Sequence, residues 1–88
     1  MADLNTWIQE VKRVSDKFDE KLSLEGEILG LNEATVKLWT SAINHPEDME
    51  SIGKRLSNLL IGTFILTEKL GIKNLEEYLQ KRLTELKK

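Results

Sequence analysis

The 88-residue sequence contains no cysteine, one histidine and one proline. Without cysteine the chain can form neither disulfides nor thiolate metal sites, which fits a reducing compartment, and we expect a cytoplasmic protein. The single histidine, His45, stands beside Pro46 at a predicted helix start and is interpreted as structural. One proline and few clusters of β-branched residues favour an all-α fold.

An excess of basic charge and a long apolar run are also lacking. Thirteen Lys and Arg against 15 Asp and Glu give a net charge of −2, so we expect no nucleic-acid partner. The longest apolar run, LLIGTFIL (59–66), is too short to cross a bilayer, and MADLNTW has no signal-peptide pattern. The length predicts a single domain over 1–88, with a limited core and no membrane partner.

Apolar residues at three- and four-residue spacing predict four helices. The first covers about 4–22, follows a cap at Asp3, and carries the stripe Leu4, Trp7, Ile8, Val11, Val14, Phe18 and Leu22. The stretch 23–34 contains Gly26 and Gly30, which disfavour helix, and is interpreted as a connector. The second helix then begins at a cap at Asn32 and ends near Ile43.

The other two helices have clearer end signals. The third is predicted from a cap at Asn44, with Pro46 in its first turn and Glu47 completing a capping box, to about Leu70. Gly71 follows as a left-handed stop. The fourth begins at a cap at Asn74 and continues to the C-terminus.

The third helix has two apolar faces. One is a continuous stripe, and the other contains Ile61, Phe64 and Ile65. A monomeric bundle needs only one stripe per helix, so the two faces indicate that this helix is central in the fold and is also buried by another subunit. We therefore expect a homo-oligomer, a dimer or a tetramer, with Ile61, Phe64 and Ile65 in the interface.

No phosphate-binding glycine loop, nucleophile elbow or His/Cys cluster occurs in the sequence. A helical hydrolase of this composition would most naturally hold Mg²⁺ with clustered carboxylates, because that ion prefers oxygen ligands. Such a site would use acids at i, i+3 and i+4 on facing helices. The segment from Ser51 to Thr67 contains no acid, however, and carries Lys54, Arg55 and Asn58 instead.

The segments LNTWIQEVKRVSDKFDEK (4–21) and ESIGKRLSNLLIGTFILTEKLGIKNLEEYLQKRLTEL (50–86) resemble the MazG-like all-α nucleoside triphosphate pyrophosphohydrolases. The resemblance covers nearly the whole chain and implies a four-helix MazG-like bundle that assembles into an oligomer. In that family the second helix carries two adjacent Glu and a third Glu three residues later, and the third helix carries Glu and then Asp. Together these acids hold Mg²⁺ against the substrate phosphates.

When the family's pattern is carried onto this chain, most of the metal-ligand positions fall on residues without a carboxylate. Glu33 matches the first Glu, but Ala34 and Lys37 stand at the other two positions of the second helix. Arg55 and Asn58 stand at the Glu and Asp positions of the third. The resemblance therefore implies a vestigial metal site with no catalytic residue, no metal and no cofactor.

Lys37 and Arg55 are candidates for direct binding of a nucleotide or phosphate anion. Glu33 could form an ion pair with either cation. The main hypothesis is thus a MazG-like protein without pyrophosphohydrolase activity, acting as a structural, regulatory or anion-binding oligomeric module.

Two alternatives stay open. One is an active Mg²⁺-dependent pyrophosphohydrolase with relocated ligands, drawn from Glu25, Glu27 and Glu33 with Asp19 or Glu20. The other is a helical protein-interaction module whose likeness to the family is shared bundle patterning alone.

Overall fold

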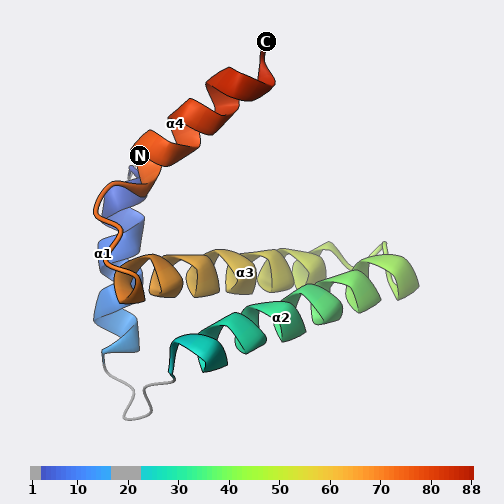
Figure 1. The fold of residues 1–88 in the computed structure, drawn as a ribbon. Helices are drawn as coiled ribbons and strands as arrows, with labels where there is room; N and C mark the ends of the chain where they lie inside the picture. Colours follow the sequence, from blue (N-terminus) through green and yellow to red (C-terminus); the bar gives the residue numbers. More distant parts are fainter. Residues whose placement is uncertain (1–2, 17–22) are drawn as a thin grey trace.

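The computed structural model describes residues 3–16 and 23–88, which form four α-helices. They are α1 (Leu4–Ser15), α2 (Leu24–Asn44), α3 (Met49–Lys69) and α4 (Leu75–Leu86). The described residues contain no strand, so the predicted all-α class is confirmed. Helices α2 and α3 form an antiparallel hairpin, α1 crosses the C-terminal end of α3, and α4 projects away from the hairpin (Figure 1).

Helix α1 begins as the sequence predicts and ends earlier. The Asp3 carboxylate accepts a hydrogen bond from the backbone N–H of Thr6 at 2.9 Å, which confirms the predicted cap. The helix ends at Ser15, whose hydroxyl donates to the Lys12 carbonyl at 3.1 Å, and Asp16 is its C-cap. Short polar side chains compete in this way with helical backbone bonds. The described helix is therefore shorter than the predicted one over 4–22, and the rest of that prediction, with Phe18 and Leu22, lies outside the described residues.

Helix α2 corrects the prediction of a connector over 23–34. Its N-cap is Ser23, whose hydroxyl accepts a hydrogen bond from the Gly26 N–H at 3.1 Å, and Asn32 is an interior residue instead of a cap. Glu25 and Glu27 lie in the first turn, where negative charge is favourable. Each interior glycine costs about 1 kcal/mol of helix propensity. The packing of α2 along α3 offsets that cost.

The predicted start of α3 is also wrong. Asn44 is the last residue of α2, His45 is its C-cap, and Asp48 caps α3 by accepting from the Ser51 N–H at 3.1 Å. Asn44 and Asp48 are both good capping residues. The longer α2 uses Asn44 as a helical residue, so the cap falls to Asp48.

The two later boundaries follow the sequence. Gly71 adopts φ 73°, its N–H donates to the Glu68 carbonyl at 3.1 Å, and the Ile72 N–H donates to the Thr67 carbonyl at 3.1 Å. This pair of bonds is the Schellman motif, which confirms the predicted left-handed stop. Asn74 caps α4 by accepting from the Glu77 N–H at 3.3 Å, as predicted.

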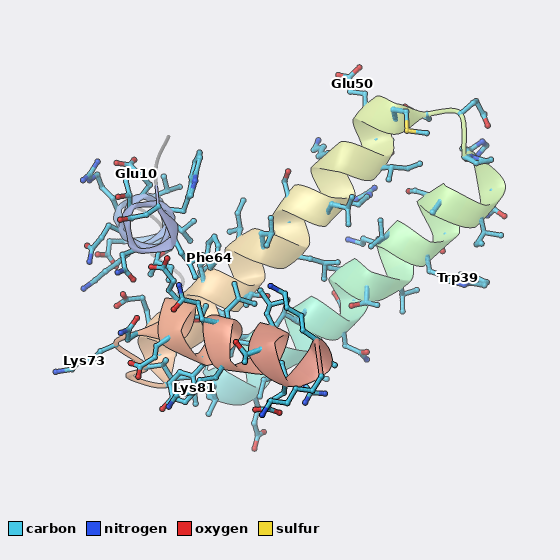
Figure 2. The ribbon with its side chains drawn as sticks, turned by 90° about the horizontal axis from the view of Figure 1, so that it is seen from above. Glu10, Trp39, Glu50, Phe64, Lys73 and Lys81 are labelled. Carbon is cyan, nitrogen blue, oxygen red and sulfur yellow. The ribbon has the colours of Figure 1, made fainter. Side chains whose placement is uncertain are left out.

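The best-buried apolar side chains lie where α1 crosses α3. Ile8 of α1 is 6% exposed and Phe64 of α3 is 9% exposed, and Phe64 points from α3 towards α1 (Figure 2). The two apolar faces of α3 thus have different neighbours in the same chain, α2 on one side and α1 on the other. Among the described helices, none combines the length and the hydropathy that a membrane span needs.

Candidate functional site

A small polar pocket lies between α2 and α3. Its volume is about 100 Å³, and it is lined by Gly30, Glu33, Ala34, Lys37, Arg55 and Asn58. The structure therefore brings together every residue that the sequence analysis placed at the vestigial metal positions. Ala34 and Arg55 are half-buried, whereas Glu33, Lys37 and Asn58 are exposed. The pocket is open to solvent and presents charged side chains from two helices.

Helical periodicity explains this convergence. Positions 30, 33, 34 and 37 lie on one side of α2, and Arg55 and Asn58 are one turn apart on α3. The helices approach closely just beyond the pocket, where Gly62 of α3 meets Leu31 of α2. A Cβ atom at Gly62 would stand 2.8 Å from Leu31 Cδ2, so the Leu31 side chain would have to move to make room for it.

The charge of the pocket favours anions. The lining contains two basic residues, Lys37 and Arg55, and one acidic residue, Glu33. Within the described part of the chain, Glu33 forms no ion pair within 4 Å with either cation, although the sequence suggested both pairs. Both cations therefore keep their donors available for a ligand.

The carboxylates of the alternative metal site do not gather on α2. At 100° per residue Glu27 lies on a different side of the helix from Glu25 and Glu33, and these two are about 12 Å apart along the helix axis. Across residues 3–16 and 23–88 there is no group of three or more His, Cys, Asp or Glu side chains that could hold a metal ion. Asp19 and Glu20, the other candidate ligands, lie outside the described residues.

A second concavity lies between α1 and α3 and is almost entirely apolar. Its volume is about 530 Å³, and its lining includes Trp7, Val11, Val14, Ile61 and Phe64. The sequence analysis assigned Ile61, Phe64 and Ile65 to a subunit interface and did not name α1 as the helix that lies against this face. The apolar stripe of α1 was the signal, because it needs a partner of matching length.

Comparisons of the chain with family models, with curated proteins and with solved structures found no match.

Proposed function

We propose that this protein is a MazG-like, oligomeric, non-hydrolytic module that binds a phosphate-bearing anion in the pocket between α2 and α3. The observation that carries the proposal is the convergence of Lys37 and Arg55 on one pocket, where Glu33 is the only carboxylate among the described lining residues. Arginine offers a planar fork of donors to phosphate oxygens, and lysine adds a compact point charge.

The size of the pocket limits what it can hold. Its volume of about 100 Å³ is far below the 300–1,000 Å³ of a typical pocket for a drug-sized ligand. One water occupies roughly 30 Å³ in the liquid, so the pocket accommodates a single phosphoryl group. The rest of a nucleotide would extend along the hairpin surface into solvent.

The chemistry of the pocket argues against turnover. Hydrolysis of a triphosphate by a metal-dependent route needs a divalent ion to neutralise developing charge and to activate water. Lys37 and Arg55 have no lone pair to offer a metal and would repel it, and Asn58 supplies at most a neutral oxygen. The same two cations favour a bound phosphate, so binding without cleavage is the expected outcome.

The interaction-module alternative also has a specific observation in its favour. Large apolar side chains on all four helices are exposed, with Trp39 at 65% and Met49 at 69%. Exposed apolar surface on this scale indicates a site of interaction with another molecule. The two readings are compatible, because an oligomeric module can also carry an anion pocket.

Titration calorimetry with inorganic phosphate, pyrophosphate and a nucleoside triphosphate tests the anion site. We expect saturable binding that weakens at least tenfold in Lys37→Gln and in Arg55→Gln, because each variant removes one charge-assisted contact of about 1.5–3 kcal/mol. Lys54→Gln is the matched control, since Lys54 is the chain neighbour of Arg55, is exposed and does not line the pocket. Equal weakening in all three variants would show diffuse charge attraction and contradict the pocket.

A further inference from the structure

The α2–α3 hairpin carries an exposed apolar face that nothing in the described chain covers. On α2, apolar residues recur every seven positions with an aromatic residue between them, and α3 contributes two further residues. We call this set the hairpin apolar face, and it consists of Leu29, Val36, Trp39, Ile43, Met49 and Leu56. Each of these side chains is at least 49% exposed, and Trp39 projects from α2 away from α3 (Figure 2).

The contributions of α2 and α3 lie on the same side of the hairpin. On α2 the half-buried residues Leu31 and Leu38 face α3. Around the helix axis, at 100° per residue, the α2 residues that line the pocket lie roughly 110° to one side of this pair. The apolar residues of the face lie roughly 120° to the other side. On α3 the seam of Leu59 and Gly62 likewise separates Asn58 from the apolar residues. Because α2 and α3 line one common pocket, their apolar residues share the opposite side.

The chain exposes more surface than a compact monomer of its mass, enough for a standard dimer interface. The chain exposes 7237 Å², whereas a compact monomer of 10.1 kDa exposes about 5,300 Å². The excess of roughly 1,900 Å² exceeds the ~800 Å² that each partner buries in a standard interface. The radius of gyration, 14.6 Å, is likewise larger than the ~12 Å of a compact chain of this length.

We infer that a second copy of this chain covers the hairpin apolar face, so that two hairpins stack as a four-helix arrangement. A two-fold contact requires a self-complementary surface, and an apolar face made of two antiparallel helices meets that requirement. Both anion pockets then stay open, because they lie on the opposite side of each hairpin. This inference does not depend on anion binding, since the two surfaces share no residue.

Sedimentation velocity of matched variants tests the inference. Leu56 on α3 and Leu79 on α4 are both 49% exposed, but only Leu56 lies on the hairpin apolar face. Leu56→Glu places a charge in the interface of each copy, and we expect the dimer dissociation constant to rise at least about a hundredfold. Leu79→Glu should change it by less than about threefold. Circular dichroism at low concentration checks that both variants stay helical.

A fluorescence measurement keeps the inference testable if Leu56→Glu fails to fold. The chain has two tryptophans, so Trp7→Phe leaves Trp39 as the only one. In that variant we expect the emission of Trp39 to shift to the red, and its quenching by acrylamide to increase, as the dimer is diluted. Three results would each overturn the inference. The first is a monomer at 100 µM, and the second is loss of the dimer in Leu79→Glu alone. The third is a protection of Trp39 that does not depend on concentration, because the chain's own α4 would then cover it.

Discussion

Gly62 of α3 lies directly against Leu31 of α2. A Cβ atom built on Gly62 would stand 2.8 Å from Leu31 Cδ2 and 3.3 Å from Leu31 Cγ, whereas a Cβ atom on Gly53 would have no heavy atom within 4 Å. The first distance is shorter than a van der Waals contact. The absence of a side chain at Gly62 therefore leaves room for the Leu31 side chain, and Gly53 has no such role within the described chain.

The two glycines should respond in opposite ways to alanine. Gly53→Ala should raise the free energy of unfolding by about 0.5–1 kcal/mol, because alanine has the better helix propensity and meets no obstacle. Gly62→Ala should lower it by about 1 kcal/mol, because the displaced Leu31 costs more than the propensity gains. Denaturant unfolding at one protein concentration measures both, and a stabilised Gly62→Ala would show that the hairpin is looser than described.

The N-cap of α1 predicts a dependence on pH. Hydrogen bonds from the backbone and then the side chain of Thr6 lower the pKa of Asp3 below its ordinary value of 3.8. A lowered native-state pKa stabilises the fold at pH values above 3.8, and this contribution disappears as the pH falls through the native pKa. Asp3→Ala should therefore reduce stability at pH 7 and have little effect near pH 2.

Asp3→Asn is the control for that experiment. Asparagine keeps a capping acceptor and does not titrate. This variant should retain most of the stability at pH 7 and lose the part of the acid dependence that Asp3 contributes. If Asp3→Ala destabilises α1 equally at both pH values, the carboxylate charge is irrelevant to the cap.

Phe64 should contribute more to the stability of the single chain than its groove neighbour Leu60. Phe64 is 9% exposed and lies beneath α1, whereas Leu60 lines the same apolar groove at 57% exposure. We expect Phe64→Ala to lower the free energy of unfolding by about 2–4 kcal/mol and Leu60→Ala by less than about 1 kcal/mol. Similar losses, measured by thermal and denaturant unfolding, would show that α1 does not cover Phe64 in solution.

The sequence predicted boundaries whose signals lie within one helical turn and missed those that depend on tertiary packing. Asp3, Gly71 and Asn74 act on backbone groups at most three residues away, so each could be identified locally. Gly26 and Gly30 suggested a connector by the same local reasoning, yet α3 supplies a packing surface that keeps this segment helical. The choice of Asp48 over Asn44 as a cap has the same origin.

The candidate site also combines features that the sequence predicted with features that it missed. The resemblance to a known family placed Glu33, Lys37 and Arg55 at related positions, and the structure shows that α2 and α3 bring them to one pocket. The hairpin apolar face was missed because its first residue, Leu29, fell in the supposed connector. The spacing of Leu29, Val36 and Ile43 was the available signal, since a seven-residue repeat within one helix marks a single side.

Restoring the acids should rebuild a metal site if these pocket positions have the proposed origin. The combined variant Ala34→Glu, Lys37→Glu, Arg55→Glu and Asn58→Asp would surround the pocket of about 100 Å³ with carboxylates beside Glu33. We expect Mg²⁺ or Mn²⁺ to bind the variant in calorimetry and to raise its melting temperature, because clustered carboxylates repel one another until a cation joins them. The unmodified chain should show neither effect. No metal binding by a folded variant would contradict the proposed origin of the pocket.

The most direct measurement of the central claim follows a nucleoside triphosphate in the presence of Mg²⁺ and of Mn²⁺. We predict that the unmodified protein binds the triphosphate, that Lys37→Gln and Arg55→Gln weaken this binding, and that no monophosphate or pyrophosphate accumulates above the buffer control. Glu33→Gln separates a trace contaminant from true turnover, because no other described residue that lines the pocket carries a carboxylate. Metal-dependent release of pyrophosphate that scales with protein concentration and disappears in Glu33→Gln would contradict the account.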